Sequence, residues 1–328
     1  MAGISSNAAY VAATFATVAA TLCASDAGAQ AYPAKNVQVV VPYTPGGSID
    51  VVTRAVARKV TELWGRNVVI DNRAGASGMI GAELVAKADP DGYTLLGTTS
   101  SYPGTVAIRK SVPFDPVKSF IPVALFGRAP LLLVVHPSVP ARSVKELVAL
   151  AKKNPGKLNY SSSGTGGNNH FSGALFATAA GVKLTHVPYR GIAQAITAVA
   201  AGEVEMSIAS GPAVMPQVRA GRIRALGVSS KEPSPLLPDL PAIAQSGVPS
   251  YTYELWWGLF APAGTPADRV NAINAIVNKA LATDDVKQFL AHEGAEPAPM
   301  SIPQLSGLLA EEIARYRKAA EEAGIPQQ

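Results

Sequence analysis

The chain has 328 residues, of which 28 are Lys or Arg and 23 are Asp or Glu, so its formal net charge at neutral pH is +5. The basic residues are scattered along the chain without a Lys/Arg run or interleaved aromatic residues, which argues against nucleic-acid binding. The single cysteine, Cys23, excludes a disulfide framework and a cysteine-ligated metal site.

Residues 1–31 have the features of a secretory signal peptide. An alanine-rich apolar run (9–20) is followed by small residues that offer two A-x-A cleavage options within residues 27–31. No Lys or Arg precedes the run, which departs from the usual signal, so a buried helix, a membrane anchor and a lipoprotein with Cys23 as acceptor stay open. An anchor would be short for a membrane span, and Leu22 is larger than the residue expected before a lipoprotein cysteine. We therefore expect a mature protein that begins near residue 30 or 32 and resides in the periplasm.

The mature chain alternates strand-like apolar runs with helical patterns, which is typical of an α/β fold with a mostly parallel sheet. The sequence predicts strands over residues 37–41, 68–72, 94–98, 131–136, 158–162, 184–189, 204–209 and 223–229. It predicts helices over residues 49–64, 143–153, 266–282, 284–293 and 302–323. Ser143 with Glu146 three residues later forms the pattern of a capping box.

Two apolar stretches, FIPVALFGRAPLLLVV (120–135) and ELWWGLFAP (254–262), are predicted to cross between two lobes. The helices that follow the second stretch indicate that the chain returns to cover its first lobe. The expected organisation is a signal peptide (1–31), a first lobe (32–127 and 259–328) and a second lobe (128–258). Two crossings of this kind provide a hinge about which the lobes can close.

The segment VVVPYTPGGSID (39–50) leads a buried strand into a glycine-rich turn and then into a helix. Unpaired N–H groups of the first helical turn converge there, and the helix dipole adds partial positive charge, so the segment predicts an anion site. Gly46 and Gly47 let the backbone approach a ligand, and Ser48 can cap the helix or donate its hydroxyl. A plain helix-capping turn is the alternative explanation.

The segment LNYSSSGTGGNNHFSGALF (158–176) repeats this order of strand, small polar residues and helix. Two such turns in different lobes can face each other across a cleft. Each would offer N–H and hydroxyl donors to one carboxylate of a ligand, so no Lys or Arg need line the site. Both turns fall at the carboxyl ends of predicted strands, where ligands gather in open α/β sheets. For His170, helix capping and ligand contact are both open.

The sequence lacks the signatures of competing functions. It contains no GxxxxGK[ST], HExxH or GxSxG motif and no cysteine pair. The segment GASGMIG (75–81) lacks the GxGxxG spacing and is interpreted as a turn and helix start. His136, His186 and His292 have no metal-ligand spacing with His170 and are expected to be structural. The sequence predicts neither a metal nor a cofactor.

Read in order, PYTPGGSID, VIDNRAGASGMIGAELVAKADPDGYTLL, FDPVKSFIPVAL, HVPYRG, RAGRIRALGVSS and GLFAPAGTP resemble one known family. It is the Bug-type (TctC-like) substrate-binding proteins of tripartite tricarboxylate transporters, which have the type II periplasmic binding protein fold. The resemblance covers nearly the whole mature chain. It implies two Rossmann-like lobes that close over a small carboxylate, held by main-chain N–H groups and ordered waters.

Matched by position, the resemblance implies ligand-binding residues in both turns. They are Tyr43, Thr44, Gly46, Gly47, Ser48 and Asp50 in the first turn, and Ser162, Ser163, Gly164, Thr165, Asn168 and His170 in the second. Asp50 is expected to order the turn and its waters, because a carboxylate in direct contact with an anion would repel it.

One departure from the family bears on the ligand. Where many members have Phe-Asp-Asn, this chain has Ile208, Ala209 and Ser210. The missing acidic residue argues against an amino acid as ligand, since a buried ammonium group needs an acidic partner. Ala209, Ser210 and Trp257 are expected to form a smaller, more apolar wall, which favours a dicarboxylate or an aromatic carboxylate.

The sequence therefore predicts a monomeric solute-binding protein that hands a small carboxylate to the permease subunits of a membrane transporter. It is not expected to be an enzyme. A ligand sensor that presents its closed form to a receptor remains an alternative. A hydrolase that uses Ser163 or His170 is a further alternative, although no acidic residue is spaced to orient His170.

Overall fold

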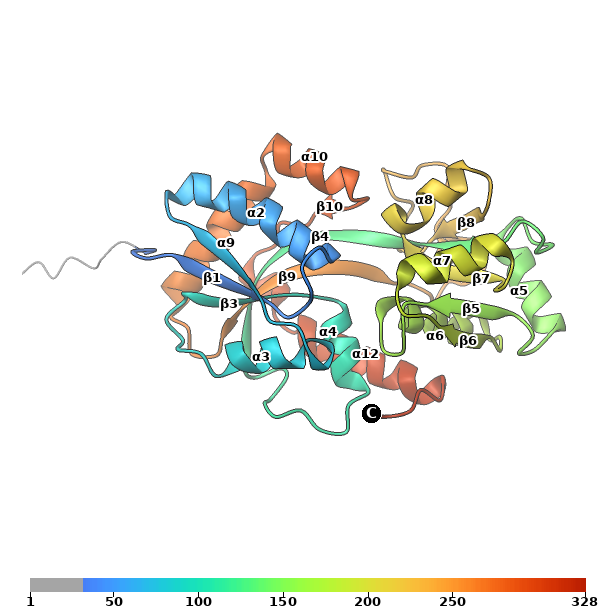
Figure 1. The fold of residues 1–328 in the computed structure, drawn as a ribbon, viewed down its shortest axis with the longest axis horizontal. Coiled ribbons are helices and arrows are strands. Elements are labelled where there is room, and N and C mark those ends of the chain that lie inside the picture. The colour runs from blue at the N-terminus through green and yellow to red at the C-terminus, as the bar shows by residue number, and fades with distance from the viewer. Residues whose placement is uncertain (1–31) are drawn as a thin grey trace, which may run out of the picture.

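The computed structural model describes residues 32–328, and the expected signal peptide with Cys23 lies outside them. Two α/β lobes lie side by side and are joined by long strands (Figure 1). The strands are β1 (Val37–Val41), β2 (Val68–Asn72), β3 (Thr94–Thr99), β4 (Phe120–Val135), β5 (Asn159–Ser162), β6 (Thr185–Pro188), β7 (Met206–Ser210), β8 (Arg224–Val228), β9 (Glu254–Pro262) and β10 (Glu296–Pro297). The helices are α2 (Ser48–Trp64), α3 (Met79–Ala86), α4 (Ser101–Ala107), α5 (Val144–Lys153), α6 (Asn168–Ala180), α7 (Ile192–Ala201), α8 (Gly211–Arg219), α9 (Ala267–Leu281), α10 (Asp284–His292), α11 (Ile302–Leu305) and α12 (Leu308–Glu322), with short 3-10 turns at Ala76–Gly78 and Ile243–Ser246.

The predicted α/β fold is confirmed, but the sheet is mixed and not mostly parallel. Its strand order is β2-β1-β3-β9-β4-β7-β5-β6, with β8 and β10 also paired to β4. β1 runs parallel to β2 and β3, and β5 runs parallel to β6 and β7. The two central strands, β4 and β9, are antiparallel to each other and to their outer neighbours. The reason is that the chain leaves the first lobe along β4 and returns along β9.

The two apolar stretches predicted to cross between lobes are β4 and β9, with the predicted bounds. Residues 120–130 of β4 pair with β9, and residues 131–135 pair with β7 and β8, so one strand serves both lobes. Apart from a few partly exposed positions, both strands are buried along their length, which fits their unbroken apolar sequence. The lobe boundaries at 127/128 and 258/259 remain a prediction, and they cut through these strands.

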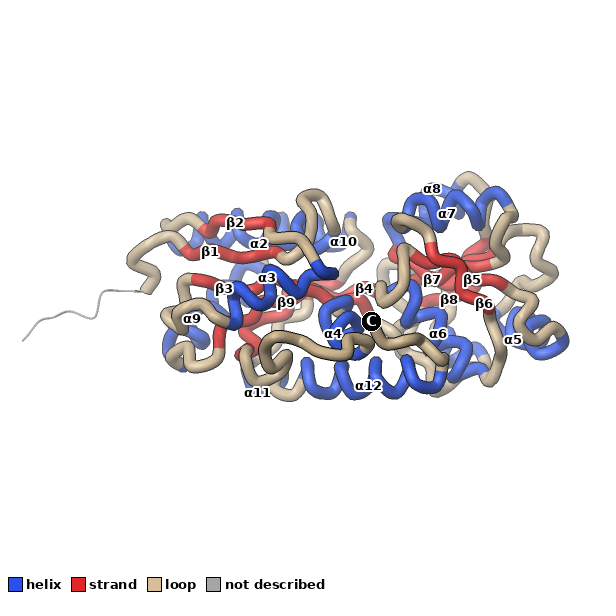
Figure 2. The backbone as a smooth tube through the Cα atoms, turned by 60° about the horizontal axis from the view of Figure 1, so that its bottom comes forward, coloured by secondary structure: helices blue, strands red, loops and turns tan. Residues whose placement is uncertain are grey.

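The C-terminal region differs from its prediction in two ways. The helix predicted over 302–323 is broken into α11 and α12, because Gly307 has a left-handed φ of 88°. Helix α12 also does not cover the first lobe alone. It lies against α4 of the first lobe and α6 of the second, as Figure 2 shows, and the Tyr316 ring packs on Phe171 with centroids 4.7 Å apart. The chain thus links the lobes a third time.

Apart from the strand predicted over 131–136, which is the second half of β4, the other strands and helices with predicted bounds lie within two residues of them, whereas no bounds were predicted for α3, α4, α6, α7 and α8. Only half of the predicted capping box at α5 is present: Ser143 Oγ accepts from the Glu146 N–H, but the Glu146 carboxylate accepts from the N–H of Arg142, the residue before the N-cap. Among residues 32–328, no helix combines the length and apolar character that crossing a bilayer requires.

A single buried hydroxyl joins the two crossings. Ser229, which follows β8 and is 0% exposed, accepts from the Leu131 N–H at 2.7 Å and donates to the carbonyl of Tyr253. The Ser229 backbone also pairs with both residues. The Leu131 N–H in β4 and the Tyr253 carbonyl just before β9 have this hydroxyl as their shared partner.

Ser229→Ala is therefore expected to lower the free energy of unfolding by about 1–3 kcal/mol, because it leaves a buried N–H and carbonyl without this partner. Urea denaturation measures the change. Ser230→Ala is the matched control, since its hydroxyl bonds only the nearby Glu232 carbonyl in a more exposed position, and it should stay within about 0.5 kcal/mol of wild type. Equal effects of the two substitutions would contradict the assignment.

Candidate functional site

The first glycine-rich turn connects β1 to α2. Gly46 has a left-handed φ of 81°, and Gly47 is the N-cap of α2 with extended backbone angles. Because Gly47 has no side chain, no side-chain hydrogen bond caps this helix. The first-turn N–H groups of α2 therefore keep their capacity to bind an anion, which disfavours the plain capping alternative. Thr44, Gly46 and Ser48 are exposed.

Asp50 organises this turn. Its carboxylate is 3% exposed and accepts from the Gly46 N–H at 2.9 Å, from Arg54 at 3.0 Å and from the Asn72 amide at 3.0 Å. Asn72 also donates to the Tyr43 carbonyl. Burial alone would raise the pKa of the Asp50 carboxyl, but these hydrogen bonds and the Arg54 charge together lower it. Asp50 is thus an ionised, fully engaged anchor of the turn.

The second turn, between β5 and α6, has the same backbone construction at positions 120 residues later. Gly166 has φ 82° and Gly167 is the uncapped N-cap of α6. The Gly167 N–H bonds the Gly164 carbonyl at 3.4 Å, as the Gly47 N–H bonds the Thr44 carbonyl at 3.4 Å. Thr165 is exposed. The two lobes therefore carry two equivalent donor-rich turns.

His170 takes the place in the second turn that Asp50 has in the first. Its Nδ1 accepts from the Gly166 N–H at 3.1 Å, so the ring is neutral with its proton on Nε2. The ring is 4% exposed and stacks on His186 with centroids 3.8 Å apart. Burial, reinforced by His186, lowers the pKa of His170 to about 4, and burial lowers that of His186 to about 4. His170 is an anchor, and His186, which the sequence gave no reason to pair with it, supports it.

The other predicted residues of the second turn have separate tasks. Ser162 is fully buried, with its hydroxyl 2.6 Å from His186 Nε2 and accepting the Gly164 N–H at 3.1 Å. Ser163 donates to Asn169 Oδ1, and Asn169 in turn donates to the Ile208 carbonyl. Ser163 and His170 are therefore held by different partners, which does not support a hydrolase that pairs them.

A third strand end, missed in the sequence, lies beside both turns. Ser101, at the start of α4, has its hydroxyl 2.9 Å from the Tyr43 hydroxyl, and Ser100 donates to Asn168 Oδ1 at 3.3 Å. The segment TTSS (98–101) spans the end of β3 and the start of α4 and has the same order of strand, small polar residues and helix. This order of residues is the sequence signal from which a third turn could have been predicted. The segment brings the two turns to a common neighbourhood.

Two predicted wall residues are buried in this structure. Ala209 is 0% exposed and packs in a core cluster with Leu132 and Val214. Trp257 is 2% exposed, and its indole N–H donates to Ser48 Oγ at 3.2 Å. Trp257 thus supports the first turn from behind, in place of forming an exposed wall. Ser210 is partly exposed and is the N-cap of α8.

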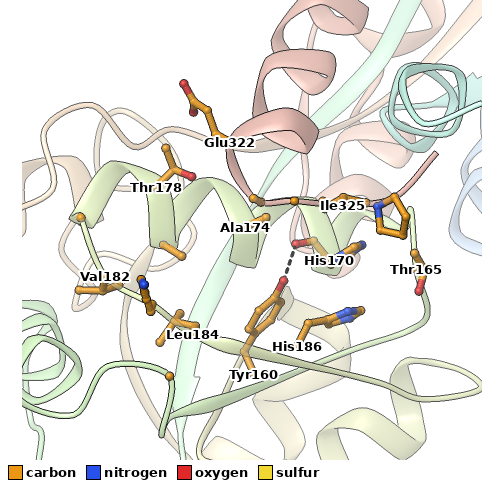
Figure 3. Close-up of a pocket in the computed structure, with 17 residues that line it drawn as sticks. Tyr160, Thr165, His170, Ala174, Thr178, Val182, Leu184, His186, Glu322 and Ile325 are labelled. Carbon is orange, nitrogen blue, oxygen red and sulfur yellow. Dashed lines mark hydrogen bonds between the residues drawn. The ribbon is translucent and has the colours of Figure 1, made fainter.

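A cavity of about 820 Å³ lies between α6, the β5–β6 strands and the last residues of the chain (Figure 3). Thr165, His170 and His186 line it together with Glu322 and Ile325. Among the described residues that line it, none belongs to the first turn. This cavity therefore reaches only the second turn and is not a cleft shared by both turns. In residues 32–328, no cluster of three or more His, Cys, Asp or Glu side chains is placed to hold a metal ion.

Comparison with known proteins agrees with this geometry. Residues 52–325 match the model of the tripartite tricarboxylate transporter family receptor. A protein encoded in the tcbD-tcbE intergenic region of Pseudomonas sp. strain P51 is 40% identical, over 88% of this chain and 86% of that protein. BugT of Bordetella pertussis is 35% identical, over 92% of this chain and 93% of that protein.

Solved structures agree in fold. An R. palustris protein determined with adipate is 39% identical with a TM-score of 0.77, covering 90% of this chain and 99% of that one. MatC from Rhodopseudomonas palustris, determined with bound malate, is 32% identical with a TM-score of 0.73, covering 88% and 99%. The predicted type II binding-protein fold is confirmed. This chain belongs to the tripartite tricarboxylate transporter receptor family, a family of solute-binding proteins.

Proposed function

We propose that this protein captures a small dicarboxylate between its two lobes, outside the cytoplasm, and presents it to the membrane subunits of a tripartite tricarboxylate-type transporter. It binds its ligand without chemical change. The observation that carries the proposal is the pair of equivalent turns, one in each lobe. The helix that follows each turn has a glycine N-cap, Gly47 or Gly167, and therefore no side-chain cap.

The two turns favour a ligand with two anionic ends. Each turn offers first-turn N–H groups, the positive end of a helix dipole and small side chains that let a carboxylate come close. One acceptor group for each lobe is what a dicarboxylate provides and a simple monoacid does not. Adipate and malate, found in two related structures, both fit this description.

The charges around the site disfavour an amino acid. Asp50 is the acidic residue of the first turn, and Arg54, Gly46 and Asn72 already occupy its carboxylate. At the end of β7, Ala209 and Ser210 supply no acidic group. A ligand ammonium enclosed there would lack a partner, which costs several kcal/mol in a buried site.

Capture and delivery would follow from closure of the lobes about β4 and β9, the two strands that join them. The exposed turn residues Thr44, Ser48 and Thr165 would become buried against the ligand as the lobes close, and the closed form would be the one that the permease recognises.

Gly47→Ser is expected to change stability and affinity in opposite directions. A serine N-cap would bond the first-turn N–H groups itself, so the free energy of unfolding should rise by a few tenths of a kcal/mol while the Kd for dicarboxylate weakens by about tenfold. The space is adequate, since an added Cβ at Gly47 would meet only the Thr44 carbonyl at 3.5 Å. Ser143→Gly, which removes the side-chain cap of α5, is the control: it should reduce stability and leave Kd unchanged. Wild-type affinity in Gly47→Ser would refute the role of the first turn.

The histidine anchor predicts a loss of stability in mild acid. The unfolded chain binds a proton on His170 near pH 6.5, but the folded protein does so only near pH 4, so the unfolded state binds more protons in this window. The free energy of unfolding should therefore fall as pH drops from 6.5 to 4, by an amount on the order of 2 kcal/mol for this group.

Urea melts at several pH values measure this effect by difference. His170→Asn keeps an acceptor for the Gly166 N–H but does not titrate, so its profile should be flatter than that of wild type. His292→Asn, at an exposed position, should follow wild type. If His170→Asn shows the wild-type slope, the anchor does not control the acid response.

Calorimetric titration with succinate, adipate, malate, citrate, terephthalate, aspartate and glutamate in one buffer tests the ligand class. Dicarboxylates without an amine are expected to bind at least about tenfold more tightly than aspartate or glutamate, because nothing in the site pairs with an ammonium group. Micromolar binding of aspartate or glutamate with none of the other acids bound would overturn the proposal.

A further inference from the structure

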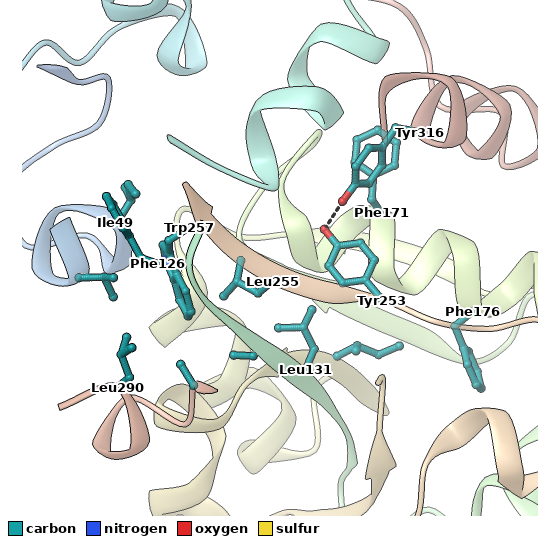
Figure 4. Close-up of a cluster of buried hydrophobic side chains, with 14 of the residues drawn as sticks. Ile49, Phe126, Leu131, Phe171, Phe176, Tyr253, Leu255, Trp257, Leu290 and Tyr316 are labelled. Atoms are coloured by element: carbon teal, nitrogen blue, oxygen red, sulfur yellow. Dashed lines mark hydrogen bonds between the residues drawn. The ribbon is translucent and has the colours of Figure 1, made fainter. Parts of the chain in front are cut away.

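Asn168, the first residue of α6, is held by two hydroxyl groups from distant parts of the chain. Its Oδ1 accepts from the Tyr253 hydroxyl at 2.9 Å and from the Ser100 hydroxyl at 3.3 Å. The Tyr316 hydroxyl of α12 donates in turn to the Tyr253 oxygen at 2.8 Å, the bond drawn in Figure 4. A chain of hydrogen bonds therefore runs from α12 through Tyr253 to the start of the second turn's helix.

This series of hydrogen bonds defines which way the Asn168 amide points. A carboxamide has one acceptor oxygen and two N–H donors on its nitrogen. In the structure the Tyr253 oxygen accepts from Tyr316 and its own hydrogen goes to Asn168 Oδ1, so the oxygen end of the amide faces both hydroxyls. The two Nδ2 hydrogens then point away from both hydroxyls, and within residues 32–328 they make no protein hydrogen bond.

Tyr253 is itself fully buried and held by several contacts. Its side chain is 0% exposed and packs edge-on against Tyr316, with the Arg315 guanidinium 5.8 Å from its ring centroid. Its backbone N–H donates to the Ser229 carbonyl at 2.8 Å. Burial raises the pKa of the Tyr253 phenol well above its ordinary value, so the hydroxyl remains a donor at every working pH. A fixed donor of this kind can hold Asn168 in one orientation.

We propose that Tyr253 is a positioning residue that, through Oδ1 of Asn168, directs the two Nδ2 donors of Asn168 toward the carboxylate bound at the second turn. The inference rests on the proposed function and adds a side-chain donor to its main-chain donors. It also gives α12 a role in the site, since Tyr316 completes the chain of hydrogen bonds. An amide fixed in this sense accepts a carboxylate and rejects a donor group.

Calorimetry on four variants tests the coupling between Tyr253 and Asn168. The probe is adipate or malate, whichever the wild type binds more tightly. Tyr253→Phe should weaken Kd by about 3- to 10-fold, in keeping with the loss of one hydrogen bond that orients a donor. Tyr251→Phe is the matched control, because that buried hydroxyl bonds Ser172 and not Asn168, and its Kd should stay within about twofold of wild type. Asn168→Ala should weaken Kd at least as much as Tyr253→Phe.

The double variant Tyr253→Phe with Asn168→Ala separates positioning from general damage. If Tyr253 acts through Asn168, the double variant binds no more weakly than Asn168→Ala alone, whereas independent structural effects would add. Wild-type affinity in Tyr253→Phe, or full additivity in the double variant, would overturn the inference and leave the proposed function standing.

A second measurement needs no ligand. The side-chain amide signals of Asn168, assigned by their loss in Asn168→Ala, should shift and broaden in Tyr253→Phe and remain unchanged in Tyr251→Phe. Unchanged signals in Tyr253→Phe would overturn the inference even for a protein that folds normally. If the wild type binds neither acid, the amide signals alone test the inference; if it binds none of the amine-free acids of the calorimetric panel, the proposed function fails, and the ligand part of this inference fails with it.

Discussion

The backbone pairing of β4 with β9 is the constraint on which the rest of the structure depends. Phe120 to Pro130 of β4 lie against Glu254 to Pro262 of β9, and every other strand of the described residues attaches to this pair directly or through one or two intervening strands. A strand that is buried on both faces must be apolar throughout. Because β4 is shared by the two lobes, its backbone N–H and C=O groups find hydrogen-bond partners in both lobes. The relative placement of the lobes therefore depends on these strands, with α12 as a third contact.

The two turns have the same backbone conformation but are held by different side chains. In each, a strand ends, a left-handed glycine redirects the chain, and a glycine N-cap leaves the first helical N–H groups uncapped. In each turn the N–H of the left-handed glycine, Gly46 or Gly166, donates to the side chain four residues later. Asp50 provides a carboxylate that stays charged. His170 provides the Nδ1 of a neutral imidazole, which can no longer accept a hydrogen bond once it is protonated. The first lobe's turn is thus insensitive to mild acid, while the second lobe's turn is not.

The site is built from segments that only the folded chain brings together. Ser101 reaches Tyr43, Ser100 reaches Asn168, and Trp257 reaches Ser48, so the strand ends β1, β3 and β5 and the crossing β9 share one polar neighbourhood. These contacts support the backbone donors from behind, and a ligand captured as we propose would meet those donors from the other side. A site of this kind selects by the position of its donors, which suits a family that uses one fold for different small acids.

The sequence by itself determined the crossings, the two glycine-rich turns, most strand bounds and the bounds of α2, α5, α9 and α10, because each depends on local signals: unbroken apolar runs, helical spacing of apolar residues, paired glycines after a strand and the N-cap Ser143. Only the tertiary structure decided the stacking of His170 on His186, the burial of Ala209 and the contact of Tyr253 with Asn168. The last pair is 85 residues apart in the chain. No local pattern encodes such contacts, because they follow from how the sheet curls and where α12 packs, and these depend on the summed burial of many side chains.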